Sequence, residues 1–332
     1  MRYPMIRLRQ IHSGITWLAL LTMVSSTHAV EVDLHPQLGS MIDQLVSEES
    51  LDRELLHGWL EEARIDENIV RIMQRPAEAW PWYRYRPRFL TRKSIRNGEK
   101  FFSRYSSSLL QAEREFGVPA EIVVAIIGIE TRYGEVTGSY RVLDSLTTLS
   151  LKYPRRSQFF LAQLKEFMIL SAHGALDPLE AKGSYAGAIG IPQFMPSSYR
   201  DYAIDFDSNG RIDLIDSPVD AIGSVAHYLS KHGWHTAEPI VERLSLSEGE
   251  RVSDFVTRNL KADISLDKLA EHGVYLSSGQ FTGNKVGVVD LEQDGYHEFR
   301  IAYPNFFVLT RYNRSSNYAM TVFELAEKIV SR

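Results

Sequence analysis

The sequence of 332 residues contains no cysteine. It therefore has no disulfide framework, no thiolate ligand for a metal ion and no thioester nucleophile. There is also no cysteine after the N-terminal apolar stretch to carry a lipid, so we expect no lipid anchor. These absences exclude a disulfide-stapled scaffold, a cysteine-ligated zinc protein and a cysteine protease.

The sequence also has no excess of positive charge. Lys and Arg number 37 against 42 Asp and Glu, a net charge of −5. The balance becomes −8 once the first 29 residues, which hold three Arg and no acid, are set aside. A nucleic-acid-binding protein needs a basic face to meet the phosphate backbone. We therefore expect no nucleic-acid partner.

The apolar stretch near the N-terminus is too short to cross a bilayer, which takes about 20 residues. It covers residues 14–24, follows Arg2, Arg7 and Arg9, and leads into small residues that end at Ala29. This order of basic, apolar and small segments is typical of a cleavable secretory signal. We expect cleavage after Ala29 and a soluble mature protein in the periplasm; a buried N-terminal helix is the alternative.

Apolar residues recur at three- and four-residue spacing over most of the chain, which indicates helices, one of them at 98–116 before Gly117. From about residue 237 the texture changes to short runs such as KVGVVDL and HEFRIAY, separated by turn pairs such as Asp294-Gly295, which is typical of hairpins. The sequence predicts a mainly α (α+β) protein. The expected segments are 1–29, a signal peptide; 30–97, an N-terminal helical domain; 98–236, a helical core; 237–304, a small β-rich inserted domain; and 305–332, which completes the core.

A carboxylate lies at the end of a strongly apolar segment, IVVAIIGIETRYG at residues 122–134. Pro119 suits the first turn of a helix and Gly134 its end. Such a helix would be buried on nearly all sides, and both desolvation and the negative end of the helix dipole would raise the pKa of Glu130. A carboxyl that stays protonated near neutral pH suits general-acid catalysis. Arg132 leaves open the alternative of a partly exposed ion pair.

A second segment, GSYAGAIGIPQFMPSSY at residues 183–199, combines glycines with aromatic residues. Small residues let the backbone approach a ligand and aromatic rings stack on sugars, although a core-lining loop is the alternative. With ETRYG at 130–134, YPRR at 153–156 and RYN at 311–313, this segment makes the chain resemble the lytic murein transglycosylase B family of peptidoglycan-cleaving enzymes. The resemblance extends from about residue 35 to the C-terminus.

The resemblance implies a lysozyme-like helical core in which a single Glu, matched by Glu130, cleaves the β-1,4 bond between N-acetylmuramic acid and N-acetylglucosamine. That acid protonates the glycosidic oxygen and then acts as a base toward the C6 hydroxyl of the same muramic acid. The hydroxyl attacks C1 and closes a 1,6-anhydro ring, so neither water nor a catalytic cofactor is needed. The sequence shows no obvious second carboxylate of the kind that a two-carboxylate glycosidase uses, although Asp144 or Glu135 could fold back into the cleft.

The resemblance also implies substrate-binding positions. Ser184 and Gln193 match polar residues beside the catalytic acid. Arg155 and Arg156 match a basic pair that could meet the carboxylates of the peptide stem, with a solvated surface pair as the alternative. The positions that match residues lining the glycan cleft are Tyr85, Phe194, Tyr228, Tyr312, Asn313 and Tyr318.

An acidic loop, DFDSNGRIDLID at residues 205–216, follows the template of a calcium-binding loop, with Gly210 at the sharp turn. Position twelve is Asp216 in place of Glu, and the resemblance favours the later Asp220 as the last ligand. The expected ligands of a structural Ca²⁺ are Asp205, Asp207, Asn209, Arg211 through its carbonyl, Asp213 and Asp220. Na⁺, or a turn that binds no metal, is the alternative. The similar run DLEQDG at 290–295 lacks an acid at position twelve and is interpreted as a hairpin turn.

Three functions are compatible with these features. The resemblance favours a lytic transglycosylase; the alternatives are a lysozyme-like hydrolase of the same bond and a non-catalytic peptidoglycan-binding protein. The acid, its polar neighbours and the aromatic residues occur together, whereas a pure binder needs only the aromatic residues. Glycan strands of peptidoglycan are the expected partner, cell-wall synthases are candidate protein partners, and we expect a monomer.

Overall fold

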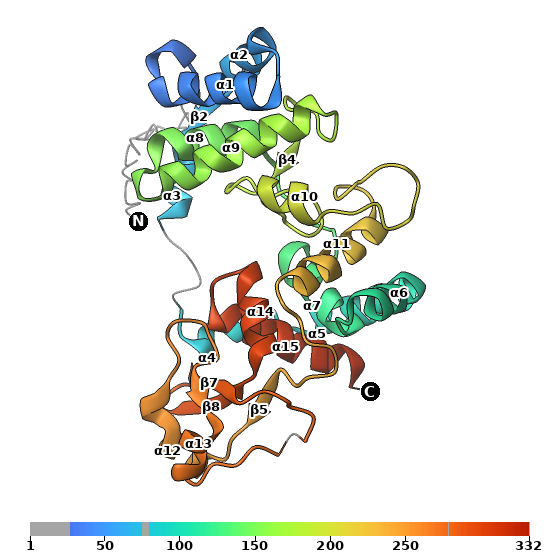
Figure 1. Ribbon diagram of the computed structural model, residues 1–332, viewed down its shortest axis with the longest axis vertical. Helices are drawn as coiled ribbons and strands as arrows, with labels where there is room; N and C mark the ends of the chain where they lie inside the picture. Colours follow the sequence, from blue (N-terminus) through green and yellow to red (C-terminus); the bar gives the residue numbers. More distant parts are fainter. Residues whose placement is uncertain (1–26, 75–79, 278, 332) are drawn as a thin grey trace, which may run out of the picture.

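The computed structural model describes residues 27–74, 80–277 and 279–331. This part of the chain holds fifteen α-helices and eight short strands (Figure 1). Helices α1 and α2 lie at one end of the long axis, a β-rich part with α12 and α13 lies at the other, and most of the remaining helices form the body between them. The chain is mainly α, as the sequence predicts.

The bounds of the elements are as follows. The helices are α1 (Pro36–Glu49), α2 (Arg53–Glu61), α3 (Glu67–Met73), α4 (Trp82–Tyr85), α5 (Arg92–Arg104), α6 (Ser106–Phe116), α7 (Ala120–Thr131), α8 (Val142–Lys152), α9 (Ser157–Ala172), α10 (Pro196–Tyr202), α11 (Pro218–Lys231), α12 (Leu246–Val252), α13 (Leu266–Glu271), α14 (Pro304–Tyr312) and α15 (Ser316–Val330). The strands are β1 (Thr27–Ala29), β2 (Arg64–Asp66), β3 (Tyr140–Arg141), β4 (Lys182–Gly183), β5 (Val241–Arg243), β6 (Ile264–Ser265), β7 (Lys285–Glu292) and β8 (His297–Ala302).

The N-terminal helices pack on the pair α8 and α9, with α1 against α9 and α3 against α8. Aspartates begin two of these helices: Asp52 accepts from the N–H of Leu55 at the start of α2, and Asp66 caps α3 in the same way. Strand β1 runs antiparallel to β2. It occupies the last three residues of the expected signal peptide, whose residues 1–26 lie outside the described part of the chain.

The segment 98–116 is two helices, so the prediction of a single helix is wrong. Tyr105, with φ −110° and ψ 22°, separates α5 from α6. Three serines follow it, and serine side chains compete for backbone hydrogen bonds and therefore favour helix ends. Helix α6 ends before Gly117 as predicted. The domain boundary expected between residues 97 and 98 falls inside α5, which packs on α7 and α15.

Helix α7 passes through the centre of the body, against α5, α6, α11 and α15. Every residue from Ile122 to Gly128 is buried, which confirms the prediction of a helix enclosed on nearly all sides. Pro119 is the residue just before the helix. The helix ends at Thr131, three residues earlier than the predicted end at Gly134.

The β-rich part is a four-stranded antiparallel sheet in the order β5-β8-β7-β6, accompanied by α12 and α13. Its central hairpin, β7–β8, turns through Gly295 at φ 87°, which confirms the hairpin expected at Asp294-Gly295. This part has a small hydrophobic core of its own. The buried residues of that core are Val252, Ile264, Leu269, Val274, Val286, Val288, Ile301 and Tyr303.

Helices α14 and α15 lead from the sheet back to the body, where α15 packs on α7 and α5 (Figure 1). The end of the chain therefore supplies part of the environment of α7, which lies about 190 residues earlier in the sequence. No helix in the described ranges combines the length and the apolar character that crossing a membrane requires.

Candidate active site

Glu130 lies in the last turn of α7 and is half-buried. The phenol of Tyr318, near the start of α15, donates a hydrogen bond to its Oε1 atom at 2.7 Å. Ser315 caps α15 by accepting from the N–H of Tyr318, and the Tyr318 side chain is only 2% exposed. A carboxylate at the end of one buried helix is thus held by a buried phenol from a second helix.

Tyr312 supports this contact. Its ring stacks on that of Tyr318, with centroids 6.4 Å apart and planes 12° apart, and its phenol donates to the carbonyl of Pro192 at 2.6 Å. Burial raises the pKa of both phenols well above its usual value, and the charge of Glu130 raises it further. Both phenols are therefore neutral hydrogen-bond donors at physiological pH.

Aromatic rings continue from Tyr312 into the interior. Its centroid lies 5.0 Å from that of Tyr228 and 5.9 Å from that of Phe194. The side chains of Phe194 and Tyr228 are 2% and 7% exposed, and the phenol of Tyr228 donates to the carbonyl of Arg311. Tyr85 is buried as well. Most of the aromatic residues expected to line a cleft thus pack against one another, whereas Tyr312 and Asn313 keep part of their surface exposed.

The backbone after Glu130 adopts an unusual conformation. Arg132 and Tyr133 have φ of 53° and 67° and are followed by Gly134 at 89°. Left-handed conformations of non-glycine residues cost about 1–3 kcal/mol each and cluster at functional sites. Thr131 stabilises the turn, because its hydroxyl accepts from the N–H of Gly134 and contacts the carbonyl of Ile191 at 2.9 Å. Neither Thr131 nor Tyr133 was predicted as a site residue, although both lie in the ETRYG motif that carried the resemblance.

Gln193 and Ser184 lie in the loop that faces this turn. Gln193, with φ 52°, donates through Nε2 to the carbonyls of Thr137 and Gly190, both at 2.9 Å. It thereby links the backbone after α7 to the loop around residue 190. The hydroxyl of Ser184 accepts from the N–H of Ala188 at 3.0 Å, so its own hydrogen can be donated elsewhere.

The basic pair Arg155 and Arg156 lies on a 3-10 turn, Pro154–Arg156, and both side chains are exposed. The guanidinium of Arg156 lies over the ring of Phe159, 4.1 Å from its centroid, which orients it by a cation–π contact. Both arginines therefore lie on the surface.

Asp144 and Glu135 are the two acids that could have served as a second catalytic carboxylate. Asp144 accepts from the guanidinium of Arg141 at 2.7 Å and from the backbone N–H of Arg64 at 2.8 Å, which links α8 to β2. Glu135 is exposed. Asp144 is thus engaged in a structural contact, and of these three acids only Glu130 receives a hydrogen bond from the aromatic cluster.

The acidic loop brings three carboxylates together. Oxygen atoms of Asp205, Asp207 and Asp220 all lie within 4.8 Å of one another. Asp220 is completely buried, and its carboxylate accepts from the backbone N–H groups of Phe206 at 2.9 Å and Asp213 at 2.8 Å. Burial raises the pKa of Asp220, since the anion is desolvated there. This convergence of carboxylates is the arrangement that a hard cation neutralises.

The remaining expected ligands surround this cluster. Asp213 accepts from the N–H of Asp216 at 2.9 Å, and the side chain of Asn209 accepts from the N–H of Arg211. Asp216 is exposed and does not belong to the cluster, whereas Asp220 does. The loop therefore favours Asp220 over Asp216 as the last ligand.

Comparisons with known proteins identify the family of the chain. Residues 34–327 match the Transglycosylase SLT domain family. The chain is 38% identical over 307 residues to the membrane-bound lytic murein transglycosylase B of Escherichia coli (strain K12), covering 89% of this chain and 83% of that protein. The chain belongs to the lytic murein transglycosylase family.

Solved structures of lytic murein transglycosylases share the fold. The soluble lytic transglycosylase SltB1 from Pseudomonas aeruginosa superposes with a TM-score of 0.80 at 42% identity, over 89% of this chain and 98% of that one. The Escherichia coli lytic transglycosylase Slt35 in complex with calcium gives a TM-score of 0.79 at 37% identity, over 89% and 92% of the two chains. The chain is thus a lytic transglycosylase, an enzyme that cleaves peptidoglycan and leaves a 1,6-anhydro product.

Proposed function

We propose that Glu130 is the single general acid and base of the transglycosylase reaction. The observation that carries this proposal is the 2.7 Å hydrogen bond from the buried phenol of Tyr318 to Glu130 Oε1. A carboxyl that changes protonation state twice in one cycle needs a fixed orientation and a neighbour that does not titrate. Tyr318 supplies both, because it is buried and its raised pKa keeps it neutral.

The reaction then proceeds in two proton transfers. Glu130 gives its proton to the glycosidic oxygen as the bond between C1 of N-acetylmuramic acid and that oxygen breaks. The resulting carboxylate takes the proton of the C6 hydroxyl while O6 forms its bond to C1, which closes the 1,6-anhydro ring. Glu130 ends the cycle protonated and no water is consumed.

The neighbouring groups position the sugar. We assign Ser184, Gln193 and Asn313 to hydrogen bonding with it, and Tyr312 to packing against it, because these residues are polar or aromatic and only half-buried. Tyr85, Phe194 and Tyr228 support Tyr312 and Tyr318 from the interior. The exposed pair Arg155 and Arg156 is suited to the carboxylates of the peptide stem.

Digestion of purified peptidoglycan by the Glu130→Gln variant tests the assignment, with mass spectrometry of the products. We expect anhydro products from the wild type and from Glu135→Gln, in which an exposed acid next to the same turn is replaced, and none from Glu130→Gln. Wild-type products heavier by one water would instead show a hydrolase. Unchanged cleavage by Glu130→Gln would remove this residue from the mechanism.

We propose further that the acidic loop holds a structural Ca²⁺. Its donor set fits the ion, because three carboxylates converge and one of them, Asp220, is completely buried. The relative Slt35 has been solved in complex with calcium. Asp205, Asp207, Asp220 and the carbonyl of Arg211 would hold the ion, with Asp213 and Asn209 beside them. Bound Ca²⁺ supplies charge neutralisation to the loop, and Na⁺ is the competitor to be excluded by direct metal analysis.

The location of the substrate favours export of the enzyme. Peptidoglycan lies outside the cytoplasmic membrane, and residues 1–29 have the pattern of a cleavable signal. We propose that the mature protein works in the periplasm, where cell-wall synthases are its candidate protein partners and glycan strands its substrate. N-terminal sequencing and size-exclusion chromatography of the exported protein test the cleavage after Ala29 and the expected monomer.

A further inference from the structure

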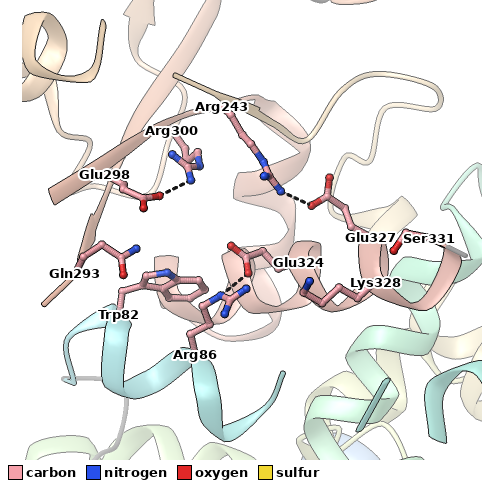
Figure 2. A pocket seen from close by; sticks show the side chains of 10 residues that line it. All are labelled: Trp82, Arg86, Arg243, Gln293, Glu298, Arg300, Glu324, Glu327, Lys328 and Ser331. Carbon is pink, nitrogen blue, oxygen red and sulfur yellow. Dashed lines mark hydrogen bonds and ion pairs between the residues drawn. The ribbon is translucent and has the colours of Figure 1, made fainter. Parts of the chain in front are cut away.

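A cavity that Glu130 does not line lies at the junction of the sheet with the helical body (Figure 2). Its volume is about 520 Å³, within the range of sites that take small molecules. None of its ten lining residues belongs to the candidate active site. They come from three regions, namely α4 with the turn after it, α15 with the end of the chain, and strands β5 and β8 with the hairpin turn, and are Trp82, Arg86, Arg243, Gln293, Glu298, Arg300, Glu324, Glu327, Lys328 and Ser331.

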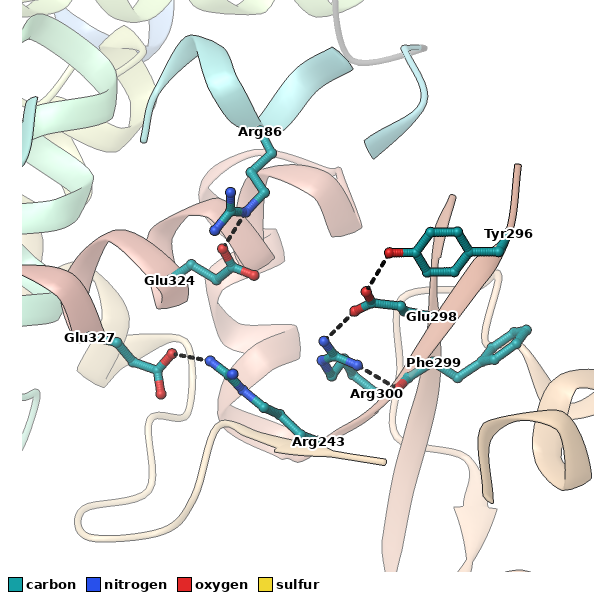
Figure 3. A network of polar contacts seen from close by, with 8 residues as sticks. All are labelled: Arg86, Arg243, Tyr296, Glu298, Phe299, Arg300, Glu324 and Glu327. Carbon is teal, nitrogen blue, oxygen red and sulfur yellow. Dashed lines mark hydrogen bonds and ion pairs between the residues drawn. The ribbon is translucent and has the colours of Figure 1, made fainter. Parts of the chain in front are cut away.

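Ion pairs from different elements surround the cavity (Figure 3). Arg86 contacts Glu324 at 2.6 Å, which joins the turn after α4 to α15. Arg243 of β5 contacts Glu327 of α15 at 3.2 Å. These contacts leave the carboxylates neutralised, because each of them already faces a guanidinium.

The third pair is enclosed. Arg300 and Glu298 contact each other on β8, and their side chains are only 15% and 24% exposed. The side chain of Glu324 is 14% exposed. Charges that are partly withdrawn from water form stronger hydrogen bonds with an incoming partner than surface charges do.

One cation is left over. The lining holds four cationic side chains and three carboxylates, and Lys328 is the cation that forms no ion pair within the described part of the chain. Figure 2 shows its side chain beside Glu324 and Glu327 at the edge of the cavity. The lining therefore carries an excess of one positive charge.

Three uncharged residues, Trp82, Gln293 and Ser331, complete the lining. Trp82 is only 2% exposed and forms part of the wall, whereas Gln293 offers an amide that can both donate and accept (Figure 2). Guanidinium and ammonium groups bind carboxylates, and a primary amide pairs with peptide groups. These are the complementary groups of a short peptide that ends in, or carries, a carboxylate.

We propose that this junction cavity, lined by Trp82, Gln293, Arg243, Arg300 and Lys328, binds a short carboxylate-bearing peptide. The ligand places its carboxylate against Lys328 and the guanidinium of Arg243 or Arg300, and its amide against Gln293. The site is separate from Glu130 and does not depend on the role assigned to that residue.

Isothermal titration calorimetry tests the site with a synthetic tripeptide of alanine, γ-linked glutamate and a diamino acid. The full mature chain is used in its Glu130→Gln form, so that binding is measured without turnover. We expect saturable binding with one site, which disappears when the carboxylates of the peptide are amidated. Absence of saturable binding by the free-carboxylate tripeptide, or equal binding of both tripeptides, would overturn the proposal.

A charge-reversing substitution tests whether the tripeptide binds in the junction cavity. Lys328→Glu should weaken the affinity for the tripeptide about five- to tenfold, which is the scale expected when one exposed ion pair is lost and replaced by repulsion. Lys285→Glu is the matched control, because Lys285 is exposed on β7 of the same sheet but does not line the cavity, and we expect no change. Equal weakening by both variants would show a general charge effect and would reject the site.

A second titration distinguishes the two sources of the peptide, intact peptidoglycan and released peptide. The same tripeptide attached to its disaccharide is compared with the free tripeptide in the Lys328→Glu and unmodified backgrounds. If the attached form also loses affinity with Lys328→Glu, the cavity takes the stem of intact peptidoglycan. If only the free form does, the cavity takes released peptide. If Lys328→Glu weakens the affinity for neither form, the site is rejected.

Discussion

The hydrogen bond between Tyr318 and Glu130 is the contact whose removal is most informative. Tyr318→Phe deletes one oxygen atom and keeps the ring that stacks on Tyr312. A hydrogen bond to a charged group contributes about 1.5–3 kcal/mol, and each 1.36 kcal/mol corresponds to a factor of ten in rate. If the bond orients the carboxyl in the transition state, kcat should fall about ten- to a hundredfold, with little change in KM.

The pH profile gives a second readout of the same variant. A donor hydrogen bond favours the ionised form of a carboxyl, so its removal favours the protonated form. The alkaline limb of the kcat profile should therefore move to higher pH in Tyr318→Phe. A residue that only packs the fold would lower activity without moving this limb.

Tyr303→Phe is the matched control. Tyr303 is also completely buried, and its phenol also donates to a carboxylate, that of Glu242, at 2.5 Å in the β-rich part. Both variants should lose about 1.5–3 kcal/mol of the free energy of unfolding, measured by chemical denaturation, because each deletes a hydrogen bond to a carboxylate. Activity is followed by the release of anhydro products from peptidoglycan. The reasoning is refuted if Tyr318→Phe keeps the wild-type kcat and pH profile while losing the same stability as the control.

Three further variants test other parts of the structure. Asp220→Asn should lower the melting temperature in calcium and abolish the decrease that a chelator causes in the wild type, whereas Asp216→Asn should behave as the wild type; calorimetry with and without chelator decides. Gly128→Ala should cost about 1–3 kcal/mol in urea denaturation, because a Cβ there would lie 2.6 Å from the ring packed against α7; Gly39→Ala, where no atom lies within 4 Å, should be neutral or stabilising, and equal effects would contradict the packing. A hydrogen bond to Asp290 raises the pKa of His297 above 6.5. The contact between His297 and Asp290 therefore contributes its full stabilisation below pH 6.5, and this stabilisation is lost as the pH rises through the raised pKa. In His297→Gln the free energy of unfolding should fall less steeply above pH 6.5, and a wild-type slope would exclude the contact.

Hydrophobic periodicity and local turn chemistry predicted much of the fold. The apolar run before Glu130 predicted a helix enclosed on nearly all sides, and α7 is such a helix. Asp294-Gly295 predicted the hairpin between β7 and β8, which the left-handed Gly295 forms. The interruption of the predicted helix at 98–116 was missed, because the apolar spacing continues across Tyr105 while the local backbone does not.

The candidate site was only partly predictable. Matching motifs selected Tyr318 and Tyr312 together, but no spacing within the sequence shows that their rings stack or that one of them donates to Glu130. The aromatic residues were expected to face a cleft, yet Phe194 and Tyr228 pack in the interior. Sequence motifs report which residues occur and not which side of a ring meets solvent.

The order of residues by itself determined the buried course of α7, the acidic loop and the family to which the chain belongs, because these depend on short-range patterns of polarity and on local turns. Tertiary packing decided which groups meet across long stretches of chain. It placed α15 beside α7, brought Asp220 next to Asp205 and Asp207, and closed the charged cavity between the sheet and α15. The physical reason is that such contacts arise when distant helices and strands bury their apolar faces together, and the geometry of that burial is a property of the whole fold.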